Sequence, residues 1–147
     1  LRWKLSSAPG DLVWQWAIAG NSDNDVLRPG VRWRAWETAW LKGIFQKIHV
    51  FYGVTIFPIQ FDSVEGYRWQ IEHAYRIQIW PSRFGNHVYV GGYLDHNFGS
   101  DEPPLVMEHQ LGVKLINGLH GVLEYRYNES LSKKYGFGIG LEYAAPF

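Results

Sequence analysis

The chain has 147 residues, no cysteine, and 14 basic residues balanced by 14 acidic ones, so its formal net charge is zero. This length fits one domain. Neutrality removes any bulk electrostatic attraction to nucleic acid, and the lack of cysteine excludes a disulfide scaffold. Aromatic residues make up 17% of the chain, with eight Trp, which is typical where amphipathic rings lie at two lipid interfaces.

Apolar and polar residues alternate along most of the chain, which predicts antiparallel strands. Residues 1–10 alternate weakly and end at a Pro-Gly turn, so we expect an N-terminal extension or partial strand there. Residues 11–147 are expected to form one barrel domain. Eight strands are expected within it, over residues 11–19, 31–41, 46–57, 67–80, 87–98, 106–115, 121–128 and 134–147.

The last expected strand, 134–147, carries the strongest pattern. Its large apolar residues share one parity, and its glycines, Lys134 and Glu142 share the other. A strand of about thirteen residues is much longer than the five or six that are usual in soluble proteins. It fits a strand with one face toward lipid and one toward a polar interior. The residues expected to face lipid are Tyr135, Phe137, Ile139, Leu141, Tyr143 and Phe147.

The connections between the expected strands alternate between short and long. With this alternation, its two-sided strands and its terminal Phe147, the chain resembles small bacterial outer-membrane β-barrels of the OmpA/OmpX-like, eight-stranded type. The resemblance implies an antiparallel, up-and-down, closed transmembrane β-barrel in a Gram-negative outer membrane. It also implies that Phe147 is a β-signal for the barrel-assembly machinery, and that membrane lipid and lipopolysaccharide surround the protein.

Charged residues fall mostly on the parity that would face the interior of the barrel. Because an unpaired charge in a confined interior costs several kcal/mol, we expect these groups to pair, with Arg126 beside Glu108 and Lys114 beside Glu124. The residues of this expected ion-pair network are Arg32, Arg34, Lys47, Arg68, Glu72, Arg76, Asp95, Glu108, Lys114, Glu124, Arg126 and Glu142.

The six histidines show no metal-ligand spacing, so no metal site and no cofactor are expected. Three of them lie on the outward parity, which suggests positions near a membrane interface or a protein contact: His73, His96 and His109.

The hairpin around Asn117-Gly118 tests the assignment of faces. A plain two-residue turn would pair Leu111 with Glu124 and place a charge on the apolar side. Paired residues share a face of the sheet. We therefore expect a turn of three to five residues, which pairs Lys114 with Val122.

Several functions remain open at this point. The first is a structural or loop-presenting barrel, with a charge-paired interior that is closed or that forms a narrow, porin-like path for ions or small solutes. The second is a lipid A-modifying enzyme, although the nearby Ser130, Ser132, His120 and Glu129 match no motif of that family. The third is the C-terminal part of a larger transport barrel. A soluble ligand-binding barrel would need the large apolar face inside, and eight strands leave too little room for it.

Overall fold

The computed structural model describes residues 2–5, 8–17, 26–62, 66–99, 105–129 and 131–143. They form one nine-stranded antiparallel sheet in which every strand pairs with its neighbours in sequence. The strands are β1 (Arg2–Lys4), β2 (Gly10–Ala17), β3 (Val26–Arg34), β4 (Val50–Asp62), β5 (Gly66–Gln78), β6 (Val88–Phe98), β7 (Leu105–Ile116), β8 (Leu119–Asn128) and β9 (Tyr135–Tyr143).

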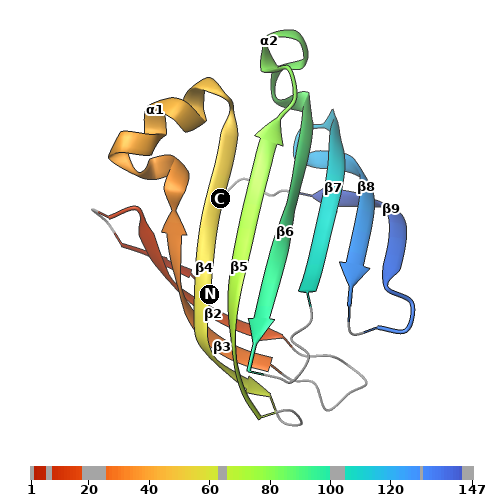
Figure 1. Ribbon diagram of the computed structural model, residues 1–147. Coiled ribbons are helices and arrows are strands. Elements are labelled where there is room, and N and C mark those ends of the chain that lie inside the picture. The colour runs from red at the N-terminus through yellow and green to blue at the C-terminus, as the bar shows by residue number, and fades with distance from the viewer. Residues whose placement is uncertain are drawn as a thin grey trace.

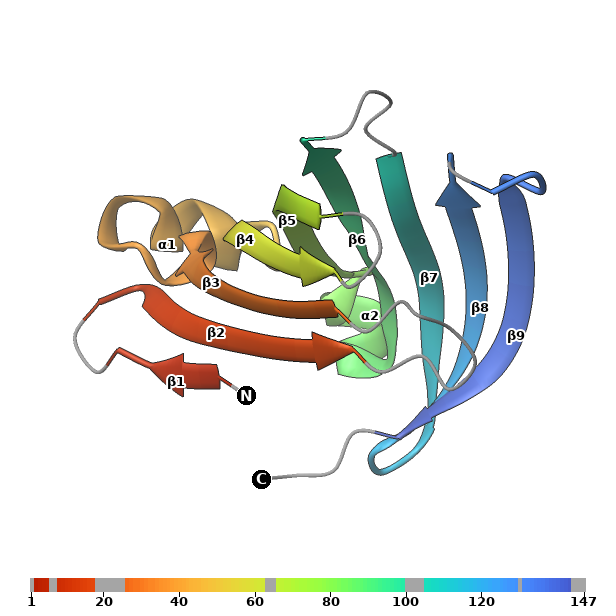
Figure 2. The ribbon, with the colours of Figure 1, turned by 90° about the horizontal axis from the view of Figure 1, so that it is seen from below.

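The sheet curls strongly, so that it has a concave and a convex side (Figures 1 and 2). The pairing runs from β1 to β9, and no pairing joins these two edge strands within the described part of the chain. The prediction of an antiparallel up-and-down sheet is therefore confirmed, whereas closure into a barrel is not observed. The strand count is nine because β1, in the stretch expected as an extension or partial strand, pairs with β2.

The expected strand 31–41 is wrong in its second half. After β3 ends at Arg34, the chain forms a 3₁₀ turn, η1 (Ala35–Glu37), and then helix α1 (Ala39–Lys47). The Thr38 amide closes the turn by donating to the Ala35 carbonyl at 3.1 Å. The helix contains mostly good helix formers, among them Ala, Leu, Lys and Gln. Lys42 and Gly43, which the sequence places in a turn between the expected strands 31–41 and 46–57, therefore lie inside α1.

Strand β4 begins later than the expected strand 46–57, at Val50, and it ends later, at Asp62, because it continues through the predicted loop at Pro58. The registers of β4 with β3 and with β5 both shift by one residue beyond Phe57, so β4 carries one extra residue at Pro58-Ile59. A bulge tolerates proline, which cannot donate to the ladder. After it, Gln60 returns to the buried side at 7% exposure.

The expected turn at 81–86 contains a short helix, α2 (Pro81–Phe84), followed by η2 (Gly85–His87).

The turn between β7 and β8 is shorter than the three to five residues predicted for it. Ile116 pairs with Leu119 across a two-residue turn, and a bulge between Lys114 and Ile116 shifts the register.

The shift pairs Leu111 with Leu123 and Gln110 with Glu124. The charges therefore share one face as expected, but an extra residue in β7 achieves this and not a longer turn.

Candidate functional site

The concave side, called here the inner face, is polar, and the convex side, called the outer face, is apolar. Buried hydrophobic residues in the described chain are Ala35, Phe57 and Tyr89, whereas seven buried residues are polar or charged. These seven are Asp11, Arg34, Thr55, Gln60, Gln70, Asp95 and His120. Soluble proteins show the opposite distribution: Ile, Val, Leu and Phe are among the residues they bury most often, and their Asp and Arg are almost never fully buried unless paired.

One row of the inner face crosses five strands, from Asp11 through Arg32, Thr55 and Glu72 to Asp95. Arg32 donates from Nη2 to Glu72 Oε1 at 2.9 Å and from Nε to Thr55 Oγ1 at 2.8 Å. Thr55 in turn donates to Glu72 Oε1 at 3.2 Å. This row pairs the half-buried Arg32 guanidinium with a carboxylate and a hydroxyl.

A second group fills the inner face beside the β4 bulge. Arg28 donates to Gln15 Oε1 at 2.9 Å and to Gln70, and Gln60 donates to Gln70 Oε1 at 2.8 Å. The Arg28 guanidinium also lies 4.5 Å from the ring centroid of Phe57, a cation–π contact.

Arg28 is absent from the predicted network because it lies between the expected strands 11–19 and 31–41, in a stretch that the sequence assigns to a connection. Residues 26–30 instead belong to β3.

A third group lies where β2 begins and β3 ends. Arg34, 2% exposed, contacts Asp11 at 3.3 Å and Glu37 at 3.2 Å. Arg2 and Lys4 of β1 reach the same two carboxylates at 3.6 and 3.7 Å. Three cations thus surround two anions, and β1 is held to the sheet by charge as well as by its ladder.

The C-terminal part of the inner face is more open. The Arg126 side chain is 64% exposed, lies 2.9 Å from Glu108, and also pairs with Glu124. The expected pair Arg126–Glu108 is therefore present, but Glu124 is bound by Arg126 and not by Lys114. Lys114 lies opposite His120 in the ladder.

Between these groups, Tyr89 lies flat across the sheet and donates to Glu142. The Arg76 guanidinium stacks 3.5 Å from the Tyr89 ring centroid. The ring needs Gly112 beneath it, since a Cβ there would lie 2.1 Å from ring carbons. A cavity of about 290 Å³ remains beside Tyr89, lined in part by Arg76, Glu108 and Glu142.

Lys47 was expected on an inward strand face, but it lies in α1, outside the sheet. The other eleven residues of the predicted network lie in strands. Arg68 lies on β5, opposite Gln60. The structure therefore brings most of the predicted charges to one surface, in several separate groups and not in one continuous network.

The outer face carries the residues expected to face lipid, except for Phe147, which lies outside the described residues. On β9 the exposed fractions rise to 81% at Phe137 and 90% at Ile139. Trp69 and Phe98 stack on the same face with their ring centroids 3.9 Å apart.

Two of the three outward histidines contact a tyrosine hydroxyl on this face, and the third packs against one of them. Tyr52 Oη lies 2.7 Å from His73 Nδ1, and Tyr75 Oη lies 2.7 Å from His109 Nδ1. His96 packs edge-on against His73. These contacts explain how histidines are accommodated among apolar residues. Within the described ranges, no group of three His, Asp or Glu could hold a metal ion.

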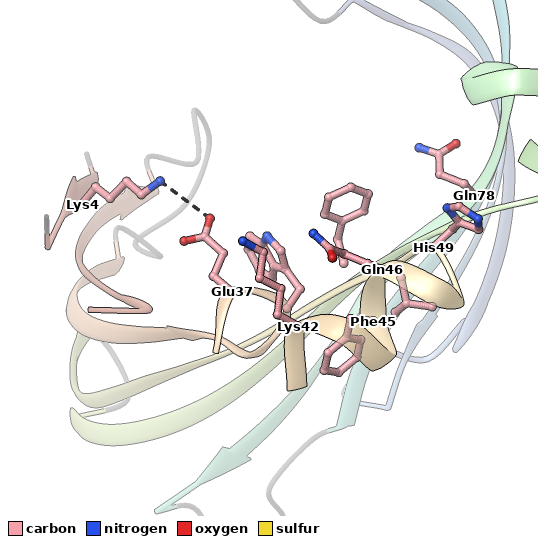
Figure 3. A pocket seen from close by; sticks show the side chains of 10 residues that line it. Lys4, Glu37, Lys42, Phe45, Gln46, His49 and Gln78 are labelled. Carbon is pink, nitrogen blue, oxygen red and sulfur yellow. Dashed lines mark ion pairs between the residues drawn. The ribbon is translucent and has the colours of Figure 1, made fainter. Parts of the chain in front are cut away.

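A pocket of about 560 Å³ lies between α1 and the ends of β1, β4 and β5 (Figure 3). Lys4 and Glu37 form an ion pair on one side of it, and Lys42, Gln46 and His49 line the helix side. Its polar groups do not form a catalytic arrangement of nucleophile and base.

The serine and histidine considered for lipid A chemistry lie far apart. His120 lies near the start of β8, whereas Glu129 follows the end of that strand and Ser132 lies further along. Nine residues of extended strand separate His120 from Glu129, roughly 30 Å. Ser130 lies outside the described residues. His120 therefore cannot act on one reacting bond together with Glu129 or Ser132.

What the structure shows is thus a mostly β protein, an antiparallel meander with a polar inner face and an apolar outer face. Comparisons with protein-family models, with curated proteins and with solved structures found no match. No helix in the described residues is both long and apolar enough to cross a membrane.

Proposed function

We propose that this chain is an integral β-sheet protein of the bacterial outer membrane, whose outer face contacts lipid and whose inner face is a charge-paired plug. In this role it is a structural or loop-presenting element, with at most a narrow path for ions. One observation carries the proposal: the buried side chains are mostly polar and the exposed ones mostly apolar.

The size of the outer face supports a lipid environment. The largest exposed apolar patch of a typical soluble monomer covers about 300–600 Å². Here exposed large hydrophobic residues occur across the sheet, from Leu12 and Trp16 on β2 to Leu141 on β9. Exposing apolar surface to water costs roughly 25 cal/mol of free energy for each Å², whereas exposing it to hydrocarbon carries no such cost.

Adjacent positions on β9 give a direct test. Ile139 lies on the outer face, and Gly138 lies on the inner face beside Glu124. We expect Ile139→Arg to lower the free energy of unfolding from lipid vesicles by about 2–4 kcal/mol, as for other cations at a bilayer midplane. Gly138→Arg, the matched control, gains Glu124 as a neighbour and should have a smaller effect.

The measurement is urea unfolding of protein folded into phosphatidylcholine vesicles, followed by tryptophan fluorescence. In a soluble protein Ile139→Arg would be neutral, because that side chain is already 90% exposed. A monomer that stays soluble without detergent and tolerates Ile139→Arg would overturn the proposal.

A second candidate follows from the sheet edges. The edge of β9 that faces away from β8 has no partner strand among the described residues. Open sheet edges are not tolerated in the hydrocarbon core of a bilayer. In a bilayer β9 would pair with β1, or with strands of a larger transport barrel.

Because the chain has no cysteine, Trp3→Cys combined with single cysteines along β9 tests this choice. An intramolecular disulfide supports closure by β1, and its absence at every β9 position supports the larger barrel.

A further inference from the structure

Helix α1 leaves the sheet at the end of β3 and projects outside the curve formed by β3 and β4 (Figures 1 and 2). The preceding turn η1 contains the buried Ala35, but no residue of α1 is itself buried. A nine-residue helix that buries no side chain gains little from tertiary packing, on which most helices depend. Another surface would therefore stabilise it.

The apolar residues of α1 share one side. At roughly 100° per residue, Trp40, Leu41, Ile44, Phe45 and Ile48 just beyond the helix fall within an arc of about 140°. Trp40, Ile44 and Ile48 are 73%, 58% and 52% exposed. This exposed stripe is the feature that requires a partner.

Phe45 fixes the direction of that stripe. Its ring stacks on Tyr52, with centroids 6.3 Å apart and planes 20° apart. Tyr52 pairs with Tyr75 in a row that leads across the outer face to His109 and Phe137. Since Phe45 belongs to the apolar arc of α1, this arc is continuous with the outer face of the sheet.

The polar residues at this end are predominantly basic. Lys42 and Lys47 are exposed on α1, and neither α1 nor α2 contains an acidic residue. Glu37, the acidic residue that precedes α1 in the chain, already contacts Arg34 and Lys4. On α2, at the same end of the sheet (Figure 1), Arg83 follows the 67% exposed Trp80.

We propose that α1 is an interfacial helix: Trp40, Ile44 and Ile48 enter the acyl boundary of one leaflet, while Lys42 and Lys47 contact anionic phospholipid head groups. Amphipathic helices with lysine on the polar side and Trp and Ile on the other bind membrane surfaces in this manner. The inference rests on the proposed membrane location of the sheet.

Nitroxide labels at single introduced cysteines test the depth of the helix. Ile44→Cys lies on the apolar stripe, Gln46→Cys on the pocket side of the same helix, and Ile139→Cys on the outer face of β9. In phosphatidylglycerol vesicles we expect the label at position 44 to be more accessible to oxygen than to a water-soluble nickel chelate. The label at 46 should show the reverse preference.

The label at position 139 separates the two proposals. If it reports lipid while the label at 44 reports water, the interfacial helix is wrong and the membrane location of the sheet stands. If both labels report water, the proposed membrane location fails as well.

The role of charge is tested by a pair of double variants that carry the position-44 label. We expect the label to lie deeper in phosphatidylglycerol than in phosphatidylcholine vesicles. Lys42→Gln with Lys47→Gln should abolish this difference. Lys133→Gln with Lys134→Gln, in the exposed turn between β8 and β9, should preserve it. An equal depth in both lipids for the protein with all four lysines would overturn the anionic-lipid contact.

Discussion

The two halves of the inner face are built differently. From β2 to β6, long side chains such as Arg28, Arg32 and Gln70 are joined across the strands by hydrogen bonds that are buried or half-buried. On β9, the same face presents Gly136, Gly138 and Gly140.

The consequence is seen in two arginines that each contact two carboxylates. Arg34 is 2% exposed between Asp11 and Glu37, whereas Arg126 is 64% exposed between Glu108 and Glu124. The number of ion pairs that an arginine makes therefore does not measure its contribution to the stability of the fold. Burial decides the cost of breaking them, because a buried charge that loses its partner cannot be solvated.

The largest expected effect is at Arg34. Arg34→Met leaves the buried Asp11 carboxylate without its nearest cation, and we expect a loss of about 3–5 kcal/mol in the free energy of unfolding. Urea unfolding in detergent micelles measures it.

The matched control is Arg126→Met, where exposure to solvent limits the loss to about 1 kcal/mol or less. A double variant, Arg34→Met with Asp11→Asn, should recover part of the stability because no buried charge is left uncompensated. Equal losses for Arg34→Met and Arg126→Met would contradict the contrast between the two halves.

The second effect concerns the boundary between the halves, where Tyr89 covers Gly112. A methyl group at Gly112 would collide with the ring at 2.1 Å, so Gly112→Ala should cost about 1–3 kcal/mol through overpacking. At Gly140 the nearest atom to an added Cβ is Val122 Cγ2 at 3.5 Å, an ordinary contact.

Gly140→Ala should therefore leave stability nearly unchanged. Thermal unfolding of the two variants in the same detergent compares them directly, and a larger loss at Gly140 would show that the inner face of β9 is packed more tightly than the structure indicates.

Alternation in the sequence was sufficient to predict the antiparallel strands and the sorting of charges to one face, because each side chain of a strand faces opposite to its neighbours. It could not predict bulges. The extra residues at Pro58-Ile59 and near Leu115 change which side chains share a face, and each depends on pairing with neighbouring strands.

Helix α1 was missed for a related reason. Trp33, Ala35, Ala39 and Leu41 keep the parity of a strand, and only Glu37 interrupted it. The ion pair between Arg34 and Glu37 spans three residues, a separation typical of a helical turn. That signal was present in the sequence, but alternation on either side of Glu37 outweighed it.

The smallest expected effect is at Glu124. The sequence-based pairing of Lys114 with Glu124 implies that Glu124→Ala leaves a cation without its partner, at a cost of a few kcal/mol. The structure lowers that expectation, because Arg126 keeps Glu108 at 2.9 Å and is exposed to solvent. We now expect a change of at most about 1 kcal/mol.

Planar-bilayer recordings measure the ionic conductance of the protein and so compare the two halves of the inner face by a second property. The protein itself should conduct poorly, because paired side chains fill the inner face from β2 to β6, and Glu124→Ala should change this little. Glu72→Ala should have the larger effect, since it removes the carboxylate that Arg32 and Thr55 share and so loosens the packed half. Large and steady conductance from the unsubstituted protein would mean that the interior is open, and the plug would then be wrong.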